Sequence, residues 1–259
     1  MPIDPAPAAR RAFVGIDFDP LDTDAAAAWL TRITPASPFR YVVTPNVDHI
    51  VRLETLGERD AAGQALWRAY RGAALVLCDS RVLARLARFY GIVLPLAPGS
   101  DLTVRIFAQV AQPGDRIAII GGDAPLLAAL RARYPALDLV QHIPPMGMLR
   151  NPAALAAAAA FGRDSAARFL LLAVGSPQQE VLAARIADDG GAQGCALCIG
   201  ASLDFIVGRQ RRAPQLVQRL GLEWAHRLAS QPGRLWRRYL VDGPRIFRLA
   251  HRWYRGRVR

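Results

Sequence analysis

FLLLAVGSPQQE (residues 169–180) and CALCIGASLD (residues 195–204) are the stretches that decide the fold. Each opens with an apolar run of strand length, so we expect buried strands over residues 169–174 and 195–199. The first run ends in the turn Gly175-Ser176-Pro177, after which an amphipathic helix begins at Gln178. A strand that passes through a tight turn into a helix leaves backbone N–H groups free above the sheet, where anions are favoured. This unit predicts an α/β protein whose sheet edge can bind an anion.

Similar units precede these stretches along the chain. Strands are predicted over residues 12–19, 41–44, 75–78, 116–120 and 137–143, and helices over 23–30, 47–56, 60–71, 125–134 and 152–161. Strands that alternate with helices of about ten residues are typical of parallel sheets with helical crossovers. We therefore predict an α/β fold with a mostly parallel, Rossmann-like sheet flanked by helices, formed by residues 1–232.

Residues 233–259 differ in character and are predicted to be a separate basic appendage. Between Arg234 and Arg259 there are nine Arg and one acidic residue, Asp242, which gives this segment most of the net charge of +12. From Pro244 onward apolar residues recur at helical spacing, while Arg245, Arg248, Arg252 and Arg255 fall on a separate stripe. The pattern is typical of an interfacial membrane helix, and equally of a helix packed on the core with its arginines in water. Both hold if the helix closes over an active site.

The remaining composition favours a cytoplasmic protein. No apolar run reaches the ~20 residues of a spanning helix, and the N-terminus lacks the form of a signal peptide. The charge concentrated in the tail favours an anionic surface, the inner face of the plasma membrane, as a partner. Cys195 and Cys198 lie three apart in a predicted strand and so on opposite faces, which makes them buried thiols rather than a metal or disulfide pair.

Polar and glycine residues cluster where the predicted strands end, which is where open α/β sheets bind ligands. They are Thr44, Asn46, Asp79, Gly121, Gly122, Gly175, Gln179 and Asp204. The glycine pair suits a turn where backbone approaches a diphosphate. Thr44, Asn46 and Asp79 can instead cap the following helices, and for Asp79 local geometry favours the cap. Asp17-x-Asp19 and Asp22-x-Asp24 resemble metal-binding pairs, but capping explains Asp22, and no metal is expected.

The motifs together resemble one family. Gly-x-Pro-x-Gln-Glu at 175–180, Arg-Ala-Pro at 212–214 and Gly-Leu-Glu-Trp at 221–224, in this order and spacing, closely resemble the bacterial WecG/TagA/CpsF glycosyltransferases. The resemblance extends over VGIDFD, TPN, GSDL, IIGG and GASLDF, and so over nearly the whole chain. It implies an inverting, metal-independent transferase without a cofactor. Such an enzyme moves a hexose or N-acetylhexosamine from a UDP-sugar to an undecaprenyl-diphosphate-linked sugar, for cell-surface polysaccharide.

The resemblance also implies roles for single residues. Asp79 stands at the position of the family's catalytic base, and Thr44, Asn46 and Gln179 match its substrate pocket. Two positions depart from the family pattern: Ser80 replaces a glycine, and Leu96 replaces an arginine that helps to neutralise diphosphate. Arg81 or a tail arginine is a candidate substitute. The tail arginines expected to serve the diphosphate and the membrane are Arg237, Arg238, Arg245, Arg248 and Arg252. Arg212 and Glu223 are expected to form an internal ion pair that anchors the tail.

Two other classes share parts of the pattern. A nicotinamide-dependent oxidoreductase has the same α/β alternation, but the sequence lacks the G-x-G-x-x-G fingerprint. A nucleic-acid-binding module would explain the Arg-rich tail and its aromatic residues. Release of UDP separates a transferase from either alternative, and no nucleic-acid partner is expected.

Overall fold

The centre of the molecule is a six-stranded sheet in which every neighbouring pair is parallel. The computed structural model describes residues 9–210 and 213–258. The strand order is β4-β3-β8-β7-β5-β6. The strands are β3 (Arg40–Val43), β4 (Leu75–Val76), β5 (Arg116–Gly121), β6 (Asp138–His142), β7 (Phe169–Ala173) and β8 (Cys195–Cys198). The predicted α/β class and parallel sheet are confirmed.

The N-terminal segment differs from the prediction of one strand over residues 12–19. It forms an antiparallel hairpin of β1 (Arg11–Phe13) and β2 (Ile16–Phe18), apart from the main sheet. The two residues between them, Val14 and Gly15, both have positive φ, 47° and 82°. This is the backbone of a two-residue hairpin turn. The apolar run hid the turn, although Gly15 marked its place.

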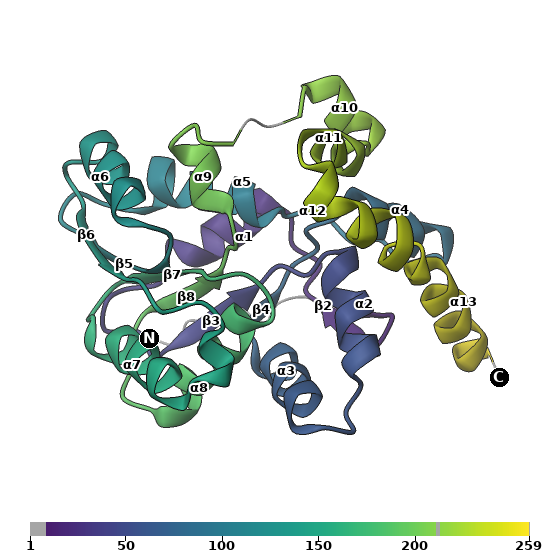
Figure 1. Cartoon of the computed structure of the whole chain (residues 1–259), viewed down its shortest axis with the longest axis horizontal. Helices are drawn as coiled ribbons and strands as arrows, with labels where there is room; N and C mark the ends of the chain where they lie inside the picture. The colour runs from purple at the N-terminus through teal and green to yellow at the C-terminus, as the bar shows by residue number, and fades with distance from the viewer. Residues whose placement is uncertain (1–8, 211–212, 259) are drawn as a thin grey trace.

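Side chains alternate across the strands and form one core on each face of the sheet. On β8, Ala196 and Cys198 belong to one core, while Cys195 and Leu197 belong to the other. The two cysteines are therefore free, buried and on opposite faces, as predicted. Figure 1 shows α3, α7 and α8 on one face and α1, α5, α6 and α9 on the other.

The helices predicted over 23–30, 47–56, 60–71, 125–134 and 152–161 begin and end close to the predicted positions, and further helices and turns join them in covering the sheet. The first group is α1 (Thr23–Leu30), α2 (Val47–Leu56), α3 (Ala61–Gly72), α4 (Arg81–Phe89) and α5 (Gly99–Arg105), which continues as the π-helical turn η1 (Ile106–Val110). After β5 follow α6 (Ala124–Arg133), the 3-10 turn η2 (Met148–Arg150), α7 (Pro152–Asp164), α8 (Gln178–Asp189) and α9 (Ser202–Ile206). Asp22, Asn46 and Asp60 accept backbone N–H bonds at the starts of α1, α2 and α3.

The C-terminal segment is helical and lies against α2 and α4. It comprises α10 (Gln215–Leu220), α11 (Glu223–Ser230), α12 (Pro232–Trp236), the π-helical turn η3 (Arg237–Asp242) and α13 (Arg245–Val258). On α13, Ile246 and Ala250 are buried, and Trp253 packs edge-on against Phe13 with ring centroids 5.3 Å apart. The inner part of the apolar face therefore packs on the core, whereas Phe247 and Tyr254 stay exposed. In the described part of the chain, no helix has the length and apolarity to cross a membrane.

Candidate functional site

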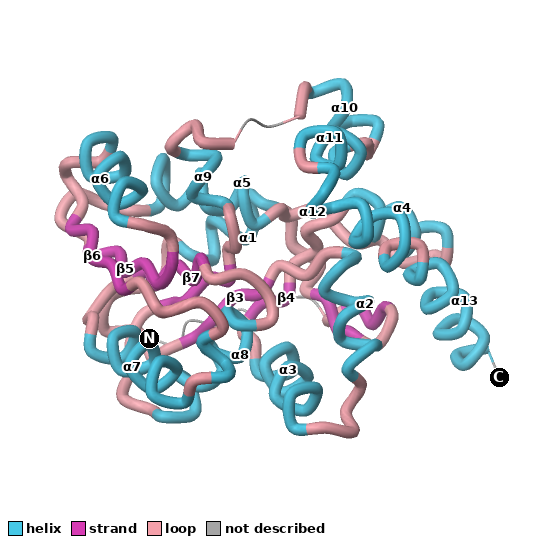
Figure 2. The backbone as a smooth tube through the Cα atoms, viewed as in Figure 1, coloured by secondary structure: helices cyan, strands magenta, loops and turns pink. Residues whose placement is uncertain are grey.

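The carboxyl ends of the central strands form a row along one edge of the sheet. Because β4, β3, β8, β7 and β5 are neighbours in that order, the residues at their carboxyl ends or up to three positions beyond them follow the same order along the sheet edge. The row comprises Asp79, Thr44, Gly200, Gly175 and Gly121. The strands that form it are coloured magenta in Figure 2. Parallel strands thus gather residues from five separate parts of the sequence at the edge where such sheets bind ligands.

Asp79 lies at one end of this row and does not cap a helix. Its Oδ1 accepts the N–H of Gly99, at 3.2 Å, and its own N–H donates to the carbonyl of Pro45 at 3.1 Å. The cap of α4 is Ser80, whose hydroxyl accepts the N–H of Leu83 at 3.2 Å. The capping alternative for Asp79 is therefore wrong, because the adjacent residue fills that role. Ser80 has a φ of −145°, which any residue adopts, so the family's glycine is not required here.

The environment of Asp79 changes its proton affinity. Loss of hydration raises the pKa of its carboxyl group to about 7, against an ordinary value near 4. Arg227, the Gly99 N–H and the Asn46 side chain act in the opposite direction and limit the rise in pKa. A carboxyl group with a pKa near neutrality can accept a proton and release it again, as a general base must.

Thr44 and Asn46 hold the neighbouring parts of the site in place. The Thr44 hydroxyl donates to the carbonyl of Cys198 at 3.4 Å, which joins the ends of β3 and β8. Gly99 packs so closely on Thr44 that a Cβ there would lie 2.7 Å from the hydroxyl oxygen. The Asn46 oxygen caps α2 by accepting the N–H groups of Asp48 and His49. Capping is confirmed for Asn46. Its side chain also helps to lower the pKa of Asp79.

Arg227 is a site residue that sequence reasoning missed. It lies on α11, yet its charge is the largest influence lowering the pKa of Asp79. Its guanidinium stacks over the ring of Phe205, 5.5 Å from the centroid. Arg227 thus acts on the charge of the catalytic candidate and packs on Phe205 of α9. Its separation of more than a hundred residues from Asp79 left no local spacing to indicate this electrostatic interaction.

The departure at Leu96 lies beside the same site. Leu96 forms a bridge with Cys78, directly before Asp79. Arg81, a predicted substitute for the missing arginine, lies with its Nε 3.8 Å from a carboxylate oxygen of Glu223. Glu223 therefore does anchor the C-terminal segment through an ion pair, but with Arg81. Its predicted partner Arg212 lies outside the described residues.

At the other end of the row, the physical reason for a glycine differs from one position to the next. Gly121 and Gly122 have φ of +105° and +72°, and a Cβ on Gly121 would lie 2.7 Å from the Ala173 carbonyl oxygen. Close packing alone therefore requires glycine at Gly121. Gly175 also has positive φ, +75°, but faces open space. Its place beside the strand end leaves its backbone accessible to a ligand.

Gln179 and Asp204 differ in exposure. Gln179 is only 3 % exposed, and its carboxamide oxygen accepts the Gly200 N–H at 2.9 Å. Gln179 therefore contacts the row of strand ends through its hydrogen bond with Gly200. Asp204 is partly exposed in the first turn of α9, on the segment that follows Gly200.

The predicted tail arginines fall into two groups. Arg238, Arg245 and Arg252 form ion pairs within the protein, with Asp48 at 3.4 Å, with Asp242 at 3.9 Å and with Glu54 respectively. Arg237 and Arg248 are exposed. Arg238 also lies close to His49 in the first turn of α2. Burial lowers the pKa of His49 to about 3, and the charges of Arg238 and Arg52 act in the same direction.

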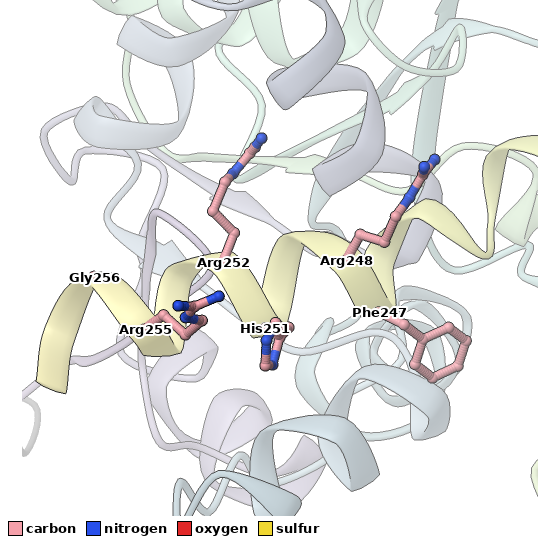
Figure 3. A pocket seen from close by; sticks show the side chains of 6 residues that line it. All are labelled: Phe247, Arg248, His251, Arg252, Arg255 and Gly256. Carbon is pink, nitrogen blue, oxygen red and sulfur yellow. The ribbon is translucent and has the colours of Figure 1, made fainter.

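An open hollow of about 690 Å³ runs along the outer face of α13. It is lined by Phe247, Arg248, His251, Arg252, Arg255 and Gly256, all from this helix. Figure 3 shows Arg248 and Arg252 extending to the same side of α13, with Phe247 pointing to another. The hollow is a cationic surface with an aromatic edge, and it is separate from the row of strand ends.

Three carboxylates from the two Asp-x-Asp pairs, those of Asp19, Asp22 and Asp24, have structural partners. Asp19 is buried, accepts the Val76 N–H at 2.7 Å and pairs with Arg10 at 3.1 Å. Asp22 caps α1, and Asp24 pairs with Arg105 at 2.7 Å. Among the described residues, no group of three His, Cys, Asp or Glu side chains is placed to hold a metal ion.

The sequence is similar to one family over almost its entire length. The Glycosyl transferase WecG/TagA/CpsF family matches residues 11–259. The matched range includes every strand and every helix of the structure, and so the whole row from Asp79 to Gly121 and the C-terminal helices.

Proposed function

The chain belongs to the WecG/TagA/CpsF family of glycosyltransferases, and from this premise we propose the specific reaction. The protein is an inverting, metal-independent transferase that moves a hexosyl or N-acetylhexosaminyl group from a UDP-sugar to an undecaprenyl-diphosphate-linked sugar. The observation that carries the proposal is Asp79, a carboxyl group of raised pKa at a strand end, held by Gly99 and close to Arg227. Family membership sets aside the oxidoreductase and nucleic-acid alternatives.

Asp79 acts as the general base of this reaction. An acceptor hydroxyl oxygen attacks C1 of the donor sugar as its proton passes to the Asp79 carboxylate. The bond between C1 and the diphosphate oxygen breaks at the same time, and UDP leaves from the opposite side, which inverts the anomeric configuration. One carboxylate suffices, whereas glycosidases require two. Support comes from the Gly99 N–H, which fixes one carboxylate oxygen.

Arg227 stabilises the departing diphosphate. The leaving group gains negative charge as the bond breaks, so a fixed cation close to it lowers the barrier. The family has an arginine at the position of Leu96, beside Asp79, whereas here Arg227 reaches this region from α11. A guanidinium suits the task because it keeps its charge and binds phosphate oxygens in pairs. The substrate site around the departing diphosphate is formed or supported by Thr44, Asn46, Gly121, Gly122, Gly175, Gln179 and Asp204.

The C-terminal residues 233–259 bring the enzyme to its lipid-linked acceptor at the inner face of the plasma membrane. Arg248 and Arg255 are exposed on α13 beside Phe247, which is 55 % exposed. Cationic side chains next to an exposed aromatic ring favour an anionic bilayer surface. Arg238 lies against α2, so the same segment also reaches the region of Asn46. The tail therefore serves both docking and the active site.

Release of UDP tests the reaction directly. The full-length protein is incubated with a panel of UDP-sugars and a short-chain polyprenyl-diphosphate sugar, with and without a metal chelator. We expect one donor to give UDP release that depends on the acceptor and survives chelation. Failure of the whole panel would refute the proposed donor class, and loss of activity on chelation would refute the metal-independent mechanism.

A further inference from the structure

A buried carboxyl group behind the strand ends, that of Glu180, has no part in the mechanism described above. Glu180, which follows Gln179 in the first turn of α8, is 1 % exposed. Its Oε1 accepts the Nε2 of Gln179 at 2.9 Å. The Gln179 oxygen in turn accepts the Gly200 N–H, also at 2.9 Å. Glu180, Gln179 and Gly200 thus form a chain of hydrogen bonds from the interior to the end of β8.

The two bonds determine how the Gln179 amide is oriented. The amide has one oxygen and one nitrogen, and a half-turn exchanges them. With Glu180 accepting from the nitrogen, the oxygen must face Gly200, whose N–H requires an acceptor. Without Glu180, only the Gly200 N–H favours this orientation, and the Gln179 nitrogen has lost its acceptor, so the amide is held less firmly. Glu180 therefore fixes the amide in the orientation in which Gln179 holds the Gly200 turn.

Stability alone does not explain a carboxyl group at this position. By strict hydrogen-bond geometry, Glu180 Oε2, Ser176 Oγ and Tyr70 OH are buried without a partner within the described residues, although the Ser176 hydroxyl is close enough to the Glu180 carboxyl group to act on its pKa, in the lowering direction. Each buried polar group without a partner costs about 1–3 kcal/mol. An apolar residue at position 180 would remove the cost of Oε2, but it would leave the buried Gln179 nitrogen without its acceptor. Residues that keep such a cost commonly serve a site.

We propose that Glu180 is a positioning residue of the donor site, which orients Gln179 so that Gly200 is held at the centre of the row of strand ends. The inference rests on the proposed function, because it assumes that the UDP-sugar binds over this row. Gly200 lies between Thr44 and Gly175 in the row, so movement of its turn displaces the donor and leaves Asp79 in place. Burial raises the pKa of Glu180 and so favours the protonated carboxyl group. A glutamine side chain reproduces that group, with one acceptor and one donor.

The test compares Glu180→Leu with Glu180→Gln. Glu180→Leu removes the acceptor for Gln179, whereas Glu180→Gln keeps it. We expect Glu180→Leu to raise the KM for the UDP-sugar about tenfold or more, with little change in kcat and in the KM for the acceptor. Glu180→Gln should retain the wild-type KM. Asp188→Leu is the matched control, because Asp188 lies on the same helix in an exposed ion pair with Arg68, and no change is expected.

Hydrogen exchange supplies a readout that does not depend on activity. The Gly200 N–H is bonded to Gln179, so its peptide should exchange faster in Glu180→Leu and at the wild-type rate in Glu180→Gln. Unchanged exchange and unchanged donor KM in Glu180→Leu would overturn the inference. A Glu180→Gln variant as impaired as Glu180→Leu would also overturn it. Absence of UDP release by the wild-type protein, with the exchange effects as expected, would instead refute the proposed function.

Discussion

Asp79 shows how a residue acquires a chemical role from its surroundings. The residue as a whole is partly exposed, yet loss of hydration raises the pKa of its carboxyl group to about 7. The neighbouring Ser80 supplies the helix cap, so the Asp79 carboxyl group is not used for that purpose. From sequence alone the two residues are equally good caps, because Ser and Asp have similar preferences at this position. Only the path of the backbone decides between them.

The first prediction concerns the base itself. Asp79→Asn keeps an oxygen that can accept the Gly99 N–H, but it cannot take a proton from the acceptor hydroxyl. We expect kcat to fall by roughly 10²-fold or more, with the melting temperature and the affinity for UDP close to wild type. Steady-state kinetics and calorimetric titration with UDP provide the measurements. A variant that turns over at the wild-type rate would exclude Asp79 as the base.

The second prediction concerns pH. The base must be ionised, so kcat/KM should rise with pH and level off above about 7, the pKa of the Asp79 carboxyl group. Arg227 lowers that pKa, so in Arg227→Gln the rise should move to higher pH. Arg185→Gln, an exposed arginine on α8, is the control and should leave the profile in place. A profile that Arg227→Gln leaves unmoved would show that the two groups do not interact.

Most elements could be predicted from the sequence because apolar periodicity encodes them. The buried runs at 116–121 and 169–173 admit only strands covered on both faces, and the order of strands and helices gave a parallel sheet. Apolar content could not distinguish the hairpin over 11–18 from a single strand, since Phe13 and Phe18 would be buried in either structure. The electrostatic interaction between Arg227 and Asp79 also has no local signature. It depends on how α11 is placed relative to α4, which the ion pair between Arg81 and Glu223 links.

A third prediction tests the start of α4. Ser80→Ala removes the hydroxyl that caps the helix and should lower the free energy of unfolding by about 1 kcal/mol. Ser80→Gly, which introduces the residue usual in the family, should lower the free energy of unfolding by only about a few tenths of a kcal/mol. Urea denaturation measures both. Neither change touches the bond between Asp79 and Gly99, so a fall in kcat as large as in Asp79→Asn would contradict the separation of roles between Asp79 and Ser80.

At the scale of the whole molecule, the question is how the C-terminal helices serve the core. The boundary proposed after residue 232 stays a prediction, while Ile246 and Ala250 of α13 are buried in the core of one sheet face. Leu235, Ile246 and Ala250 would be lost in a truncation, which would also expose their partners. Point substitutions on the outer face of α13 therefore test membrane docking more cleanly than deletion.

The fourth prediction uses such substitutions. Arg248 and Arg255 are exposed, and each should gain ~1 kcal/mol near an anionic leaflet. Arg248→Glu with Arg255→Glu should therefore greatly reduce sedimentation with anionic vesicles at low salt. Arg163→Glu with Arg185→Glu, on α7 and α8, changes the net charge equally and should have a much smaller effect. Equal losses in both double variants would reduce the docking to non-specific attraction.

The central claim is inverting transfer from a UDP-sugar to a lipid-diphosphate sugar, without a metal. The measurement that tests it most directly follows an isotope-labelled sugar from the UDP-sugar in the presence of a chelator, with mass spectrometry and NMR of the product. The proposed mechanism predicts that the label moves to the lipid-linked acceptor and that the anomeric configuration is opposite to that of the donor. Label released as free sugar whether or not the acceptor is present, or transferred with the donor's configuration retained, would contradict it.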